Sequence, residues 1–178
     1  MLTEEQRRDL VHRARTAMEG QVTGRALALP PGIDFPHASG AFVTIKRRGQ
    51  LRGCLGTLEC RGDLADEVAR CAADAASEDP RFPPVAPDEL SELEVEVSVL
   101  GPLEPIDPTR PDAFVIGRHG LVVEQGIHRG LLLPQVATEW GWTAEQFLRQ
   151  TCVKAGLPPD AWQRGAVVYR FAADVFGD

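Results

Sequence analysis

The sequence is poor in several features that mark large classes of protein. Its four cysteines form no Cys-x-x-Cys pair, and lysine occurs only at Lys46 and Lys154. Disulfide scaffolds are short and cysteine-dense, and structural zinc sites take their ligands in close pairs, so this spacing favours neither. No apolar run approaches the ~20 residues of a membrane-spanning helix. The charged segment 3–8 also lacks the apolar core of a secretory signal.

The charge balance argues against a further class. The chain has 26 Asp and Glu residues against 19 Lys and Arg, and its formal net charge is −7. A general nucleic-acid binder needs a broad basic face, which this total does not favour. With 43% hydrophobic residues over a length of 178, the composition is that of an ordinary globular chain. We therefore expect a cytoplasmic protein with no nucleic-acid or membrane partner.

Hydrophobic periodicity and turn residues predict helices set between paired strands. Helical patterns cover residues 3–20, 63–76 and 143–155, and apolar alternation or β-rich composition predicts strands at 41–46, 51–58, 93–99 and 167–171. A second hairpin is predicted from segments 121–123 and 131–133, which flank Gln125-Gly126. Because strands and helices do not alternate regularly, we predict an α+β fold with an antiparallel or mixed sheet and flanking helices.

The segment Leu51-Arg52-Gly53-Cys54-Leu55-Gly56-Thr57 points most directly to chemistry. Alternation along a strand places Arg52, Cys54 and Gly56 on one face. Two glycines in a short strand often mark a place where another group approaches the backbone closely. A guanidinium on the same face as Cys54 would favour the thiolate, which is the nucleophilic form. The segment therefore predicts an accessible, activated thiol.

Basic residues precede this segment across a predicted turn. Lys46, Arg47 and Arg48 concentrate positive charge in an acidic chain, which suits an anionic ligand such as a carboxylate or phosphate. A structural alternative stays open at this point. Cysteine is among the most buried residue types, and a basic hairpin can simply protect an edge strand from aggregation.

His119 is the second candidate for chemistry. It lies between Gly117 and Gly120 in a predicted turn, and histidine is the side chain suited to proton transfer near neutral pH. The alternative is an exposed turn histidine with no role. The sequence contains no phosphate-binding loop, His-Glu-x-x-His, Gly-x-Ser-x-Gly or dinucleotide fingerprint, and no metal site is predicted. A thiol site is therefore the familiar mechanism that remains.

At segment 51–57 the sequence resembles the AMMECR domain family, named for a human chromosomal-deletion region. The family signature Leu-Arg-Gly-Cys-[Ile/Leu]-Gly is intact here. The resemblance continues in order through the segments Asp79-Pro80-Arg81-Phe82-Pro83-Pro84, Gly117-Arg118-His119-Gly120-Leu121, Arg129-Gly130-Leu131-Leu132-Leu133-Pro134-Gln135-Val136 and Lys154-Ala155-Gly156-Leu157, and at Trp162. It therefore covers nearly the whole chain. The family more often has lysine where Arg118 stands.

The resemblance implies a single AMMECR domain over residues 1–178, made of a larger and a smaller subdomain with a cleft near segment 51–57. Bacterial and archaeal members are often encoded beside a Memo-type protein that resembles non-haem dioxygenases and beside a radical S-adenosylmethionine protein. The resemblance therefore implies partners of these two kinds, as in AmmeMemoRadiSam systems, while the family supplies no established reaction or cofactor. The motif residues expected to contact a substrate are Gly53, Gly56, Thr57, Arg81 and Gln135.

Two hypotheses follow from the sequence. In the first, the chain is an enzyme or the catalytic component of a multi-protein system that acts on a small or peptide-borne anionic substrate. Cys54 is then the nucleophile or redox thiol, Arg52 lowers its pKa or holds the anion, and His119 transfers protons. In the second, the chain is a non-catalytic binding or adaptor module, and Gly53 and Gly56 let a partner chain lie close to the strand.

Overall fold

The structure is a computed structural model that describes residues 2–31 and 33–178. The chain forms two compact units. Unit 1 consists of residues 1–100 and 174–178, and unit 2 of residues 101–173. Each unit has its own cluster of buried apolar side chains. The predicted cleft and the single-domain organisation stay predictions.

The two helices of unit 1 begin at the caps that their sequences predict. Helix α1 (Glu4–Thr23) starts with a capping box at Thr3 and ends at Gly24, whose φ of +67° places it in the left-handed region. Glycine adopts this conformation without steric cost, which explains why α1 ends at Gly24. Helix α2 (Leu64–Ser77) has Asp63 as its N-cap, and the Asp63 carboxylate accepts the Ala65 N–H.

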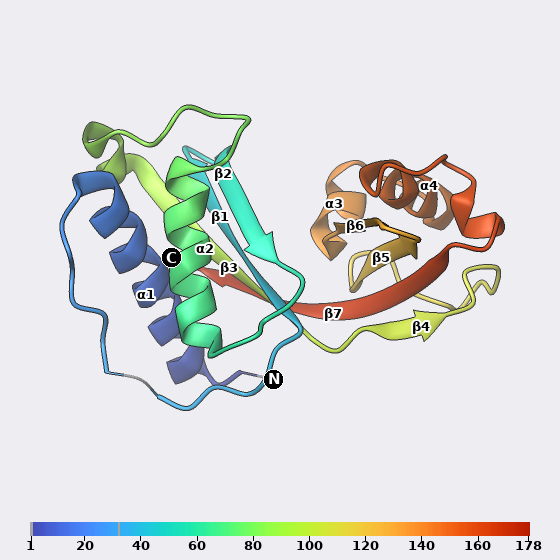
Figure 1. The fold of residues 1–178 in the computed structure, drawn as a ribbon, viewed down its shortest axis with the longest axis horizontal. Coiled ribbons are helices and arrows are strands. Elements are labelled where there is room, and N and C mark those ends of the chain that lie inside the picture. The colour runs from blue at the N-terminus through green and yellow to red at the C-terminus, as the bar shows by residue number, and fades with distance from the viewer. Residues whose placement is uncertain (1, 32) are drawn as a thin grey trace. The chain divides into compact units, whose positions relative to one another are not determined.

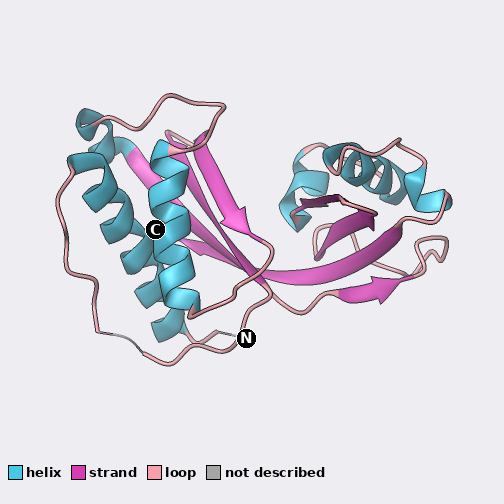
Figure 2. Cartoon of the chain, viewed as in Figure 1, coloured by secondary structure: helices cyan, strands magenta, loops and turns pink. Residues whose placement is uncertain are grey.

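The sheet of unit 1 places strand β1 in its centre. Strands β1 (Gly40–Arg47), β2 (Gln50–Thr57) and β3 (Leu93–Leu100) pair antiparallel in the order β2-β1-β3. The β1–β2 turn has positive φ at both Arg48 and Gly49, as a tight type I′ hairpin requires. Helices α1 and α2 cover one face of this sheet (Figures 1 and 2). The buried side chains on that face include Ala41, Val43, Ile45, Val95 and Val97.

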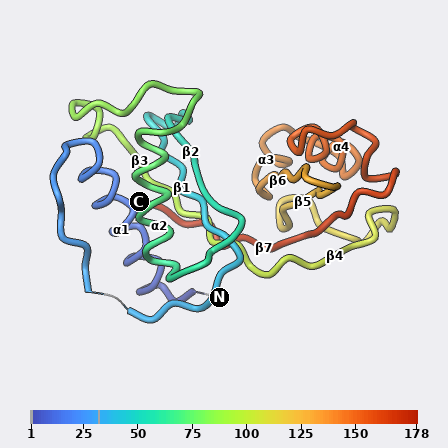
Figure 3. The backbone as a smooth tube through the Cα atoms, viewed as in Figure 1, coloured from blue at the N-terminus to red at the C-terminus, as the bar shows by residue number. Residues whose placement is uncertain are grey.

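A proline-rich loop joins α2 to β3. In Figure 3 this loop passes beside β2, and two hydrogen bonds tie it to the backbone of that strand. The loop ends in a 3₁₀ turn, η1 (Pro87–Glu92). Since β2 is the edge strand of unit 1, the loop covers backbone groups that would otherwise be unpaired.

Unit 2 is a smaller antiparallel sheet with two short helices. Its strands lie in the order β4-β7-β5-β6, and β7 continues into unit 1 with its last residues. The strands are β4 (Glu104–Ile106), β5 (His119–Gln125), β6 (His128–Leu132) and β7 (Val167–Gly177). The helices are α3 (Pro134–Glu139) and α4 (Ala144–Lys154), and a 3₁₀ turn, η2 (Ala161–Gln163), precedes β7.

The α+β class and the antiparallel sheet with flanking helices are confirmed. Sequence patterns missed α3 and β4, because both elements are too short to show a period, and β7 runs to Gly177 rather than ending at the predicted residue 171. Among the described residues, no helix is long and apolar enough to span a bilayer.

Candidate functional site

A β-bulge at Arg52 changes the geometry that alternation predicts. Ile45 pairs with Gly53 and Lys46 pairs with Leu51, so Arg52 is an extra residue with no partner on β1. Its guanidinium binds the Glu89 carboxylate through Nε at 2.9 Å and Nη2 at 3.0 Å. Cys54 instead pairs with Thr44, on the face opposite to the helices. The prediction that Arg52 and Cys54 share a face is therefore wrong.

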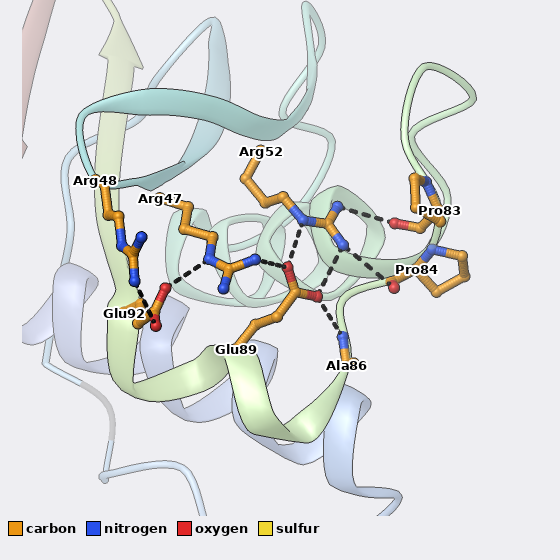
Figure 4. A network of polar contacts seen from close by, with 8 residues as sticks. All are labelled: Arg47, Arg48, Arg52, Pro83, Pro84, Ala86, Glu89 and Glu92. Carbon is orange, nitrogen blue, oxygen red and sulfur yellow. Dashed lines mark hydrogen bonds and ion pairs between the residues drawn. The ribbon is translucent and has the colours of Figure 1, made fainter.

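The cations of the hairpin are also not free. Figure 4 shows Arg47 and Arg52 sharing the Glu89 carboxylate, while Arg47 and Arg48 bind the two oxygens of Glu92. Arg52 further donates to the carbonyls of Pro83 and Pro84. Lys46 Nζ lies 2.9 Å from a Glu96 oxygen. Each of these four cations is paired with a carboxylate, and the prediction that the hairpin suits an anionic ligand stays a prediction.

Cys54 is held at both backbone groups by one ion pair. Asp79 Oδ2 accepts the Cys54 N–H at 2.9 Å, and Arg81 Nη2 donates to the Cys54 carbonyl at 3.4 Å. Arg81 Nη2 also lies 2.7 Å from Asp79 Oδ2, and only 2% of the Asp79 side chain is exposed. The Arg81 guanidinium holds the pKa of Asp79 well below its usual range. The Asp79-Pro80-Arg81 segment thus clamps the open edge of β2 at this residue.

The Cys54 thiol is half-buried, and its environment favours the neutral form. Burial raises its pKa above the ordinary value, and the negative charges of Asp79 and Glu96 add to this effect. The hydroxyl of Thr44, 3.3 Å from Sγ, and the charge of Arg81 act in the opposite direction. The net shift is upward, and its causes do not include Arg52, whose predicted roles of lowering this pKa or holding an anion stay predictions.

A polar row crosses three strands at this level of the sheet. Thr44 on β1 pairs with Cys54 on β2 and with Glu96 on β3, and Lys46 binds Glu96 from the next outward position of β1. We call Cys54, Thr44, Glu96 and Lys46 the Cys54 row. Thr44 and Glu96 carried no signal in the sequence beyond their outward positions in two strands, because the pairing that joins them to Cys54 is long-range.

The two glycines of the motif, Gly53 and Gly56, lie close against other parts of the protein. A Cβ on Gly53 would collide with the Ala75 carbonyl of α2, and one on Gly56 would collide with the Phe42 ring and the Ala41 carbonyl. Gly53 therefore lets α2 approach the sheet, and Gly56 makes room for Phe42. Both positions have a structural reason that needs no ligand.

Thr57 and Gln135 lie at the ends of elements. The Thr57 hydroxyl donates to the Glu59 carbonyl and accepts the Glu59 N–H, which closes a turn after β2. Gln135 lies in the first turn of α3 in unit 2, and its Oε1 is buried without a hydrogen-bond partner in the described structure. The predicted substrate contacts of Gly53, Gly56, Thr57, Arg81 and Gln135 stay predictions.

His119 belongs to unit 2 and begins β5 rather than lying within the turn. Its Nδ1 accepts the Val115 N–H at 2.9 Å, so a neutral His119 carries its proton on Nε2. Burial lowers the pKa of His119, and the charges of Arg170 and Arg118 lower it further. Cys54 belongs to unit 1, and the predicted role of His119 in proton transfer stays a prediction.

Residues 2–31 and 33–178 contain no group of three or more His, Cys, Asp or Glu side chains arranged to hold a metal ion. Cys60, Cys71 and Cys152 are free and buried. Burial raises the pKa of Cys71 to about 11. Cys54 is therefore the most accessible of the four thiols.

The chain is similar to archaeal proteins of closely matching length. A protein of Methanothermobacter thermautotrophicus is 48% identical, with 98% of this chain and 95% of that protein covered. One from Thermococcus gammatolerans is 49% identical over 94% of this chain and 87% of that protein. The crystal structure of the uncharacterized protein PH0010 from Pyrococcus horikoshii matches with a TM-score of 0.89 and 43% identity, over 99% of this chain and 93% of that one.

The family model covers the motif segments that carry the resemblance. The family model named AMMECR1 matches residues 10–176, which include the Cys54 segment, the Asp79–Arg81 clamp and the core elements of both units. By this match and by the identity to full-length relatives, the chain belongs to the AMMECR1 family.

Proposed function

We propose that the chain is a binding component whose site is the Cys54 row, and that Cys54 acts there as a neutral thiol. One observation carries the proposal. The Asp79–Arg81 pair fixes the backbone of Cys54, while burial raises the pKa of its thiol. A thiol that is held firmly in place and kept protonated suits hydrogen bonding to a ligand better than nucleophilic attack, which requires the thiolate.

The charges of the row favour a ligand with both donors and acceptors. Lys46 and Glu96 form a mixed pair, and the Thr44 hydroxyl lies beside the thiol. A zwitterionic or amide group of a small molecule or peptide can exchange hydrogen bonds with such a row. An anion alone is less well supported, because the guanidinium groups of the hairpin are all paired. In the multi-protein system that the family resemblance implies, Memo-type and radical S-adenosylmethionine partner proteins would use the same ligand.

Amide-resolved NMR with small probes tests this proposal. Glycylglycine as zwitterion, N-acetylglycine methylamide as amide, and acetate and phosphate as anions are titrated separately into the ¹⁵N-labelled chain. We expect glycylglycine or the amide to shift the signals of Thr44, Cys54 and Glu96 most, and Cys54→Ser to retain the shifts of Thr44 and Glu96. The proposal fails if only the anions act, with their shifts at the hairpin turn.

A catalytic component is the second candidate, and one contact favours it. The Thr44 hydroxyl and the charge of Arg81 both lower the Cys54 pKa, so a ligand that displaced Asp79 from Arg81 would shift the thiol toward its reactive form. For this candidate, Cys54→Ser keeps the fold and the probe-induced shifts but abolishes any turnover of substrate. The binding proposal instead expects Cys54→Ser to support the function of the complete system.

A further inference from the structure

A stacked pair of tryptophans lies at the surface of unit 2. The rings of Trp140 and Trp142 have centroids 6.2 Å apart and planes 14° from parallel. Trp140 is 71% exposed, which is a large fraction for tryptophan because its side chain has a large apolar surface. We call the two rings the tryptophan platform.

The platform is rigid because it is built on the core. Trp142 packs against Phe147, which is fully buried in the core of unit 2. Gly141, with a φ of +64°, makes the turn between the two tryptophans. The Trp140, Gly141 and Trp142 N–H groups all bond to carbonyls of α3. The outer face of Trp140 is therefore presented in a fixed orientation, and a ligand that stacks on it loses little entropy in ordering the protein.

Acidic residues flank the platform. Glu139 precedes Trp140, Glu145 lies in the first turn of α4, and both are exposed. Neither carboxylate makes an ion pair or a side-chain hydrogen bond with any other residue that the structure describes. The sequence from 130 to 148 contains no Lys, Arg or His, so the local charge is negative. The face of an indole ring attracts cations, and nearby carboxylates strengthen that attraction.

We propose that the tryptophan platform docks a basic segment of a partner protein by receiving an arginine side chain on the face of Trp140. The guanidinium group is planar and stacks on aromatic rings while it keeps its N–H groups for carboxylates. Glu139 and Glu145 supply those carboxylates. The platform belongs to unit 2, whereas the Cys54 row belongs to unit 1.

In the test, a peptide of alternating glycine and arginine with three arginines is titrated into the ¹⁵N-labelled chain. Binding is monitored through the indole N–H signals. We expect the Trp140 signal to shift most and Trp140→Ala to weaken binding about fivefold, in keeping with an exposed cation–π contact. Trp140→Phe, which keeps an aromatic face, should retain part of the affinity. Ile127→Ser is the matched control, because Ile127 is 95% exposed in unit 2 and lies outside the platform.

A pair of double variants separates local from overall charge. Glu139→Gln with Glu145→Gln should weaken peptide binding about threefold. Glu5→Gln with Glu78→Gln removes the same charge from unit 1 and should leave binding unchanged. Equal binding by Trp140→Ala and the original chain would overturn the proposal. So would equal effects of the two double variants, or a larger Trp140 shift with methyl glucoside or a glycine–glutamate peptide.

Discussion

At the scale of single residues, the Leu51–Thr57 motif is explained first by packing and only then by chemistry. Gly53 admits the backbone of α2, and Gly56 admits Phe42. Cys54 is the motif residue whose surroundings go beyond packing, because its two backbone groups are bound by the buried Asp79 and its partner Arg81. Cys54 and Arg81 were predicted from the sequence as site residues. Asp79 and Thr44 were not, because their roles depend on contacts across strands and loops.

Gly53→Ala tests the packing explanation. The added methyl group collides with the Ala75 carbonyl, so α2 or β2 must shift, and we expect a loss of about 1–3 kcal/mol in the free energy of unfolding. Urea denaturation measures this loss. Gly62→Ala is the control, since a Cβ there meets nothing within 4 Å and should change stability by less than about 0.5 kcal/mol. Equal stabilities of the two variants would contradict the close contact.

At the scale of elements, features that depend on residues close in sequence could be predicted, whereas features that depend on long-range contacts could not. Caps and periodicity predicted α1 and α2, and Gly49 predicted the β1–β2 turn, because these depend on residues close in sequence. The bulge at Arg52 was not predictable in that way. Its guanidinium binds Glu89, 37 positions along the chain, and no local pattern announces that partner.

The ion pairs between the hairpin and η1 predict a pH-dependent stability. Arg52 is the main cause of the lowering of the Glu89 pKa from 4.5 to about 2, and the Glu89 side chain is 12% exposed. Since this pKa is lowered in the folded state, the stabilisation is present above pH 4.5 and is lost as the pH falls from 4.5 toward 2.

Glu89→Gln therefore removes a contribution that depends on pH. We expect it to destabilise the chain by about 1–3 kcal/mol at pH 7, and the difference from the original chain to shrink steadily between pH 4.5 and pH 3. Urea unfolding at a series of pH values measures it. Glu5→Gln serves as the control, because Glu5 is exposed in α1 and forms no ion pair with the residues that the structure describes. A difference that stayed constant with pH would refute the ion-pair account.

At the scale of the whole molecule, the net negative charge of the chain predicted the surroundings of the hairpin better than the local cluster of basic residues did. The net charge of −7 is distributed so that Glu89, Glu92 and Glu96 neutralise the hairpin cations. These carboxylates come from η1 and β3, so a reading along the hairpin alone overstated its positive charge. The α+β class and the family could be predicted from the sequence, whereas the pairing that creates the Cys54 row required the folded chain.

The neutral state of the Cys54 thiol is the central claim, and a direct titration tests it. The chain is labelled with ¹³C at the cysteine Cβ, and the Cys54 signal, assigned with Cys54→Ser, is followed from pH 6 to pH 11 by NMR. The account predicts a midpoint above the ~8.5 of a free cysteine, because burial and the charges of Asp79 and Glu96 outweigh Thr44 and Arg81. A midpoint below ~7.5 would place Cys54 among activated thiols and contradict the account.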